Sequence, residues 1–203
     1  MIADIDGKQF RLTLFVTQFI LSVLLITIAS SVALAARQPV DDELRTLLID
    51  AAGSTDSFVD RFEAEVWLSD MSGRLQKYMP DVDQRIYLLK NVHYEAKRAN
   101  LAPELVLSVI HVESLFNRWA ISSVGAQGLM QVMPFWLKEI GHENDSLFDI
   151  KTNLRFGCTI LRHYLDKEKG NLTRALARYN GSLGRYKYPN KVLERLQNRW
   201  FRR

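Results

Sequence analysis

Apolar residues recur at intervals near 3.6 along most of this 203-residue chain. Leu68, Met71 and Leu75, for example, fall on one face of a helix drawn through residues 56–79. No run alternates between apolar and polar residues as a half-buried strand would, and there is no internal repeat. The pattern therefore predicts an all-α fold.

Prolines and glycines divide this pattern into separate helices. Pro80 ends one helix, and Pro103 begins another at a position where its missing N–H costs nothing. The predicted helices are residues 41–52, 56–79, 83–100, 103–115, a short one between Pro134 and Gly141, 151–168, 172–179, and 189–201 with Pro189 at its start.

The N-terminal segment has the pattern of an export signal. Lys8 and Arg11 precede an uncharged run of 25 residues from Leu12 to Ala36, and Ala33-Leu34-Ala35 fits a small-x-small cleavage site. Residues 1–35 are therefore predicted to be a signal peptide. The alternative is an uncleaved anchor in the inner membrane, because the run is long enough to span a bilayer. Either way, the rest of the chain is expected in the periplasm or cell envelope.

Charge is distributed unevenly along the remaining chain. Residues 36–70 carry a net charge of −6 and residues 174–203 a net charge of +8, so the overall +4 is mainly a property of the C-terminal end. The basic end is interpreted either as a solvated helix face or as a surface that binds an anionic polymer or membrane. We therefore expect an acidic helical extension at 36–82 and a compact helical domain at 83–203.

The few cysteines and histidines limit the chemistry available to the chain. The one cysteine, Cys158, excludes an intramolecular disulfide and any zinc site with two thiolates from one chain. None of the four histidines lies in an H-E-x-x-H motif. We predict no metal, no cofactor and no nucleic-acid partner, and we expect Cys158 to be a buried, inert thiol in a monomer.

Glu113 lies on the apolar face of the helix predicted at 103–115. At about 100° per residue it points roughly 180° away from Glu104, among the valines and isoleucine of that helix. Burial and the negative end of the helix dipole would both favour the neutral carboxyl, which could then donate a proton near neutral pH. The alternatives are a buried ion pair, or a helix that ends early and exposes the side chain.

Three short motifs place this glutamate in a wider pattern. They read Glu113-Ser114, Gly128-Leu129-Met130-Gln131 and Arg178-Tyr179-Asn180. In this order and spacing, over about residues 85–195, the sequence resembles the soluble lytic transglycosylase family, which has a goose-type lysozyme-like fold. Arg178 departs from the family's alanine at that position, while Tyr179 and Asn180 are kept.

The resemblance implies an enzyme that cleaves the glycan strands of peptidoglycan between N-acetylmuramic acid and N-acetylglucosamine. Glu113 matches the family's catalytic acid, which would protonate the glycosidic oxygen while the substrate's own N-acetyl group stabilises the cation. The same carboxylate would then take a proton from the C6 hydroxyl, so that a 1,6-anhydro ring closes without water.

The acidic residues agree with a mechanism that uses one carboxylate. Ordinary glycosidases need two carboxylates, and residues 114–138 contain no aspartate or glutamate, although one from elsewhere could fold in. Two alternatives stay open: a hydrolytic muramidase on the same fold, and a non-enzymatic peptidoglycan-binding envelope protein.

The resemblance also implies five substrate-binding positions. Ser122 and Gln131 match residues that hydrogen-bond sugar substituents, and Met133 matches a residue that lines the cleft. Tyr179 matches the tyrosine near the acid, where its phenol could hold the carboxyl in place. Asn180 is either a site residue or a helix C-cap. The other four also have ordinary explanations as turn, capping or core residues.

Overall fold

The structure of the chain is a computed structural model that describes residues 57–140 and 144–201. The chain divides into two units, residues 1–41 and residues 42–203, and all described residues belong to the second. The predicted signal segment and the helix predicted at 41–52 lie outside the described residues. None of the described helices is long and apolar enough to cross a membrane.

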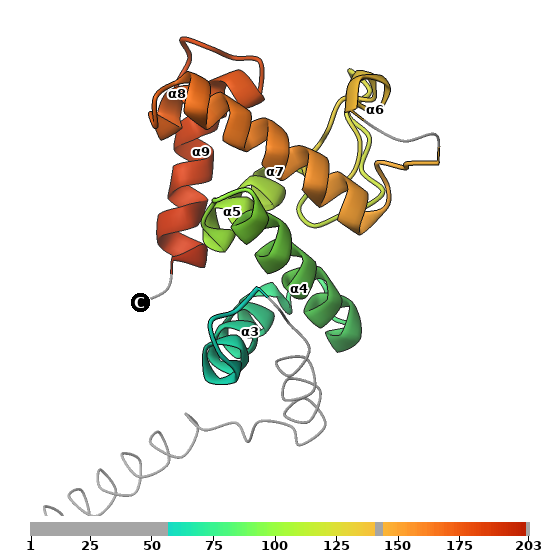
Figure 1. Cartoon of the computed structure of the whole chain (residues 1–203), viewed down its shortest axis with the longest axis vertical. Coiled ribbons are helices and arrows are strands. Elements are labelled where there is room, and N and C mark those ends of the chain that lie inside the picture. The colour runs from blue at the N-terminus through green and yellow to red at the C-terminus, as the bar shows by residue number, and fades with distance from the viewer. Residues whose placement is uncertain (1–56, 141–143, 202–203) are drawn as a thin grey trace, which may run out of the picture. The chain divides into compact units, whose positions relative to one another are not determined.

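The described residues form helices and no strand, apart from isolated bridges at Ile121–Gln127 and Gln127–Val132. The prediction of an all-α fold is therefore confirmed. The elements, shown in Figure 1, are α3 (Arg61–Leu75), α4 (Val82–Arg98), α5 (Pro103–Glu113), α6 (Phe135–Ile140), α7 (Ile150–Lys167), α8 (Leu172–Tyr179), α9 (Lys187–Arg195) and a π-helical turn, η1 (Leu196–Trp200).

Side-chain caps define where several of these helices begin. Asp60, Asp81, Asp149 and Asn171 precede α3, α4, α7 and α8, and each accepts a hydrogen bond from a backbone N–H in the first turn. Such caps satisfy donors that the helix itself leaves free. The caps at 81, 149 and 171 place these starts within one residue of the predicted positions.

The C-terminal helix differs from its prediction. It begins at Lys187 rather than at Pro189, and from Leu196 it continues as a π-helical turn. Proline is accepted in the first turn because the N–H groups there have no partner within the helix. The irregular turn places Trp200 in the core, where its side chain is fully buried.

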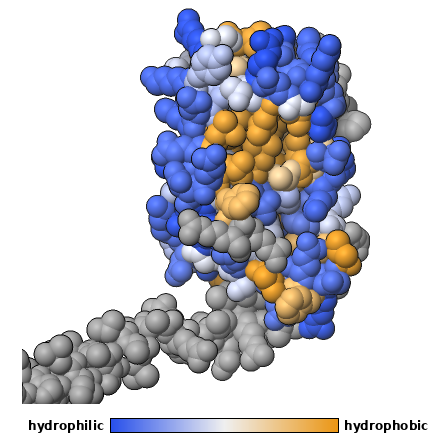
Figure 2. Space-filling view, turned by 90° about the vertical axis from the view of Figure 1, so that its left-hand side faces the viewer, coloured by the Kyte–Doolittle hydropathy of each residue, from blue (hydrophilic) through white to orange (hydrophobic). Residues whose placement is uncertain are grey.

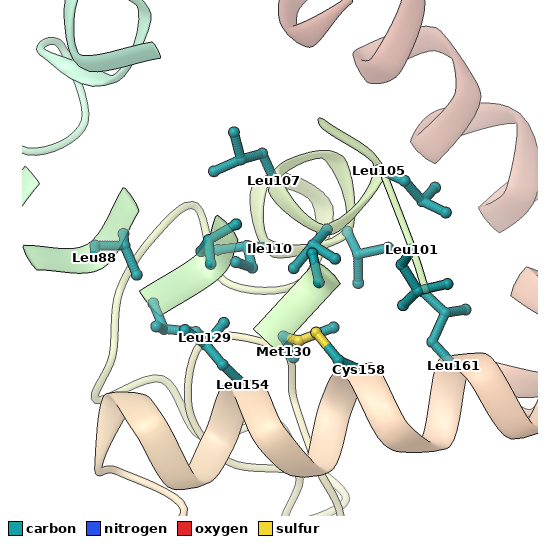
Figure 3. Packing of buried hydrophobic residues seen from close by; sticks show 14 of the residues in the cluster. Leu88, Leu101, Leu105, Leu107, Ile110, Leu129, Met130, Leu154, Cys158 and Leu161 are labelled. Atoms are coloured by element: carbon teal, nitrogen blue, oxygen red, sulfur yellow. The ribbon is translucent and has the colours of Figure 1, made fainter. Parts of the chain in front are cut away.

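The core surrounds α5. In Figure 1, α5 lies at the middle of the helices, with α4 and α9 packed against it, while α7 packs against α4 and α8. In Figure 3, Leu105, Leu107 and Ile110 of α5 lie above α7, and Met130 lies between the two helices. The labelled core residues are Leu88, Leu101, Leu105, Leu107, Ile110, Leu129, Met130, Leu154, Cys158 and Leu161. Cys158 is fully buried, as expected, and burial raises the pKa of its thiol.

The C-terminal turn is fastened to α5 through a buried histidine. The Trp200 indole N–H donates to His111 Nδ1 at 3.1 Å, and His111 Nε2 lies 2.9 Å from the Tyr78 hydroxyl. Because an indole nitrogen only donates, the neutral imidazole must carry its proton on Nε2 and donate it to Tyr78. Burial and nearby Arg195 lower the pKa of His111 to about 4, so the ring is neutral at pH 7. The hydrogen bond from Trp200 therefore holds α5 at His111, two residues before Glu113.

Candidate active site

Glu113 is the last residue of α5, and its side chain is partly exposed. Its Oε1 accepts a hydrogen bond of 2.6 Å from the Tyr188 hydroxyl, and Tyr188 is itself buried. Burial raises the pKa of Glu113 to about 7, against the lowering effect of the hydrogen bond from Tyr188. The expected direction of the pKa shift is therefore found, with burial as its first cause.

The backbone turns sharply after Glu113. Leu115 and Phe116 adopt left-handed conformations with φ of 51° and 68°, although neither is glycine. Phe116 is buried among aromatic residues, and its burial offsets the cost of this conformation. The prediction that this helix runs to residue 115 is therefore wrong by two residues, and Glu113 stands at the helix end.

A pocket of about 380 Å³ opens beside the carboxyl. Its lining comes from the end of α5, from the segment between α8 and α9, and from the start of α9: Val112, Glu113, Asn180, Ser182, Arg185, Lys187, Tyr188 and Lys191. Glu113 is the only acid among these described residues. Figure 2 views the molecule from the left-hand side of Figure 1, where α8 and α9 lie, and shows apolar surface bordered by hydrophilic residues.

The loop after α5 is tied to the end of that helix by the serine of the first motif. Ser114 Oγ donates to the carbonyl oxygen of Leu129 at 2.8 Å. Leu129 belongs to the second motif, so the two motifs meet in space through this bond. The residue directly after Glu113 is thereby fixed to the motif loop.

Two residues predicted to bind sugar form hydrogen bonds within the loop. Ser122 Oγ accepts from the backbone N–H of Ala126 at 3.0 Å. Gln131 Nε2 donates to the carbonyl oxygens of Ala120 and Gly128 at 3.1 and 3.0 Å, which uses both of its N–H groups. Both side chains thus support the fold of the loop.

Only one of the five predicted substrate-binding residues shares the pocket with Glu113. Asn180, the exposed C-cap residue of α8, is part of the lining, whereas Ser122, Gln131 and the partly exposed Met133 are not. Tyr179 also lies outside the lining. These three loop residues therefore belong to a different part of the surface from the Glu113 pocket.

The tyrosine that holds the carboxyl is Tyr188 and not the predicted Tyr179. The Tyr179 hydroxyl donates to the carbonyl oxygen of Met130 at 2.8 Å, so it supports the second motif instead. Tyr179 is nevertheless close to the acid, because after burial the charge of Glu113 is the next cause that raises the pKa of Tyr179. The sequence offered one weak signal for Tyr188: together with Val192 it forms the buried stripe of the amphipathic α9.

Asn153 was also missed by the motif analysis, although it organises the loop. Its side chain is buried within α7, where Oδ1 accepts from the Met130 N–H at 2.8 Å. Nδ2 donates to the carbonyl oxygens of Gln127 and Leu147 at 2.9 and 2.7 Å. One polar position in an otherwise apolar helix face was the available signal, since buried amides are generally hydrogen-bonded.

Arg178, the departure from the family motif, has a local explanation. Its guanidinium pairs with the carboxylate of Glu168, which also pairs with Arg174. The two arginine partners hold the pKa of Glu168 below its ordinary value. Arg178 therefore joins the end of α8 to the end of α7 and does not line the Glu113 pocket.

The comparisons with known proteins agree with this arrangement. The sequence model of the Transglycosylase SLT domain matches residues 90–198, more than half of the chain. The chain therefore belongs to the SLT transglycosylase domain family, and the resemblance drawn from the three motifs is confirmed.

Individual relatives match shorter parts of the chain. A transglycosylase of Enterobacteria phage PRD1 is 36% identical over 104 residues, which cover 48% of this chain and 38% of the phage protein. Membrane-bound lytic murein transglycosylase C of Actinobacillus pleuropneumoniae is 51% identical over 39 residues, covering 19% and 11%.

The chain also resembles part of a much larger solved structure, an inactive mutant of the lytic transglycosylase Slt from Pseudomonas aeruginosa. The identity is 27%, the TM-score is 0.45, and the match covers 68% of this chain and 25% of that one. The chain thus spans well under half the length of these relatives.

Proposed function

We propose that this chain is a lytic transglycosylase that cleaves peptidoglycan between N-acetylmuramic acid and N-acetylglucosamine. The observation that carries the proposal is Glu113, an acid at the end of a core helix whose pKa is raised to about 7. About half of such carboxyls still hold their proton at neutral pH and can release it to a leaving group. Membership of the family and the names of the relatives support the choice of substrate.

In the first step Glu113 acts as the general acid. It gives its proton to the glycosidic oxygen, and the bond from that oxygen to C1 of the muramic acid breaks. The positive charge that develops at C1 is stabilised by the substrate's N-acetyl oxygen. Tyr188 holds Oε1 of the carboxyl, which leaves the other oxygen to face the bond.

In the second step the ionised Glu113 acts as the general base. It takes the proton of the C6 hydroxyl while that oxygen attacks C1, which closes the 1,6-anhydro ring and restores the protonated acid. A carboxyl with a pKa near the working pH suits both roles, because neither protonation state is strongly disfavoured.

The single acid in the pocket supports this route over two-carboxylate hydrolysis. A retaining glycosidase holds its second carboxylate about 5–5.5 Å from the first. The described residues that line the Glu113 pocket include no other aspartate or glutamate. The substrate's own N-acetyl and C6 hydroxyl groups would supply what a second carboxylate or water supplies elsewhere.

Product analysis of digested sacculi tests this function. Wild type is expected to release products that end in 1,6-anhydromuramic acid, detected by mass spectrometry. Glu113→Gln should keep the fold and release none, whereas Glu194→Gln, an exposed acid on α9, should leave the rate unchanged within about twofold. Reducing ends in place of anhydro ends would establish the hydrolytic muramidase instead. Full activity of Glu113→Gln would exclude the proposed acid, and binding without cleavage by wild type would indicate a non-enzymatic envelope protein.

We also propose that the chain works in the periplasm or cell envelope as a monomer. The export pattern of residues 1–35 supports this location, and so does the relative described as membrane-bound. Residues 36–82 would form an extension before the catalytic domain at 83–203, and the basic end at 174–203 would help to hold the enzyme on anionic envelope polymers. Cell fractionation, gel filtration, and sacculus binding at increasing salt test these points. Binding that salt does not weaken would count against the basic end.

A further inference from the structure

Three basic side chains line the pocket that contains Glu113, and none of them has a partner within residues 57–140 and 144–201. Arg185, Lys187 and Lys191 are exposed, and their side chains form no ion pair or hydrogen bond with any described residue. Arg174 and Arg178, which lie nearby in sequence, are both paired with Glu168. The arginines of α8 therefore form ion pairs within the fold, whereas the cations at the pocket form none with the described residues.

Lys187 stands where a helix disfavours positive charge. It is the first residue of α9, and the first turn contains no acid. The N-terminal end of a helix carries a partial positive charge, so a cation in the first turn destabilises the helix. Stability of α9 therefore does not account for lysine at position 187.

The pocket wall formed by Arg185, Lys187 and Lys191 therefore offers three cations, and Glu113 is the only acid among the described residues of the lining. Together the cations favour a ligand group with negative charge.

We propose that this wall, Arg185, Lys187 and Lys191, binds a carboxylate of the substrate next to the bond that Glu113 cleaves. The inference rests on the proposed function and specifies which glycans fit. A strand made only of N-acetylglucosamine carries no charge and leaves the three cations without a partner. Muramic acid carries a lactyl group whose carboxylate is either free or extended by a peptide with carboxylates of its own. Charge complementarity thus selects strands that contain muramic acid.

The test uses three glycans and two matched double variants. The glycans are strands with their peptides, strands stripped by an amidase so that the lactyl carboxylate is free, and neutral chitin oligosaccharides used as binding ligands. Lys187→Gln with Lys191→Gln removes two charges at the pocket. Lys151→Gln with Lys167→Gln removes two exposed charges from α7, outside the pocket lining.

The pocket double variant should raise KM on muramic strands about tenfold, because two of the three charges that would attract the substrate carboxylate are removed. Its kcat should stay within about twofold, and the Kd for chitin oligosaccharides should not change. The α7 variant should match wild type throughout. An effect on peptide-bearing strands alone assigns the carboxylate to the peptide, and an effect on stripped strands alone assigns it to the lactyl group.

The stability of the variants separates a binding role from a structural one. The pocket double variant should melt at the wild-type temperature or slightly above it, since it removes the cation in the first turn of α9. If it melts lower, Arg185→Gln, which lies outside any helix, gives the same KM test.

Three results bear on the inference in different ways. Equal KM for the pocket and α7 variants on both muramic strands would overturn the carboxylate site while the proposed function stands. An equal loss of chitin binding would show that the lysines contact sugar in general, and would overturn it too. If wild type releases no glycan product, the proposed function itself fails, whatever the variants do.

Discussion

Two segments near Glu113 use their polar side chains in opposite ways. In the loop at residues 114–133, which follows Glu113 but does not line its pocket, Ser114, Ser122 and Gln131 form hydrogen bonds to the loop's own backbone. In the segment at residues 180–191, which does line the pocket, Arg185 and Lys187 have no partner among the described residues. The first segment carries the whole second motif, whereas the second carries only Asn180 of the third. A motif can therefore mark the scaffold of a site, while most groups free to meet a ligand lie outside it.

The largest effect is expected from a residue that supports the motif loop from outside it. Asn153→Ala removes the bonds to the Met130 N–H and to the carbonyl oxygens of Gln127 and Leu147, which leaves buried polar groups without partners. We expect a loss of about 3 kcal/mol in the free energy of unfolding. Urea denaturation measures it.

Ser122→Ala is the matched control for Asn153→Ala, because it removes one partly exposed bond within the same loop. It should cost no more than about 1 kcal/mol. If Asn153→Ala loses no more stability than the small loss expected for Ser122→Ala, the loop does not depend on Asn153. The contrast between the loop at 114–133 and the segment at 180–191 would then weaken.

The next effect concerns how the protonation of Glu113 contributes to stability. The pKa of Glu113 is raised in the folded state from 4.5 to about 7, so its stabilising effect is complete below about pH 4.5 and is lost as the pH rises through 7. Glu113→Gln keeps a neutral group at every pH. It should therefore be more stable than wild type by about 2 kcal/mol at pH 8 and equal to it at pH 4.

Thermal melting of wild type and Glu113→Gln at both pH values checks this expectation. Glu194→Gln is the control, since its carboxylate is exposed on α9. A constant difference between wild type and Glu113→Gln from pH 4 to pH 8 would mean that the carboxyl is not held in its neutral form.

The third effect tests the contribution of α9 to the acid itself. Tyr188→Phe removes the hydrogen bond that lowers the pKa of Glu113, so the alkaline limb of the pH–rate profile should move to higher pH. The rate should fall about tenfold because the carboxyl loses its orientation.

Tyr179→Phe provides the comparison from the neighbouring tyrosine. Its hydroxyl bonds to the Met130 carbonyl oxygen, so this variant should lower stability and leave the alkaline limb in place. If the limb moves with Tyr179→Phe and not with Tyr188→Phe, the carboxyl has the other tyrosine as its partner in solution.

The sequence allowed the helices and the acid to be predicted because both depend on local information. The apolar period, together with the breaks at proline and glycine, predicts the starts of α4, α7 and α8 to within one residue, whereas α3 begins at Arg61 and not at the predicted residue 56. The position of Glu113 on an apolar helix face follows from helix geometry alone. Each of these features involves residues close together in the chain.

The rest depended on contacts that no local pattern contains. Tyr188 meets Glu113 across 75 residues, and Asn153 meets Met130 across 23. The left-handed turn at Leu115 and Phe116 is held by the burial of Phe116 against Trp200, far away in sequence. Tertiary packing decides such features, and a single sequence does not show which distant residues will meet.

The smallest effect should come from Arg178, the position where the sequence departs from its family. Arg178 lies in neither of the two segments compared above. After Arg178→Ala the carboxylate of Glu168 keeps Arg174 as a partner. Paired surface charges contribute little, so the melting temperature should fall by no more than about 3 °C, and KM on muramic strands should stay within about twofold of wild type. A KM increase as large as that of the Lys187 and Lys191 double variant would show that the whole basic end acts as one surface. The distinction between the paired arginines of α8 and the unpaired cations at the pocket would then no longer hold.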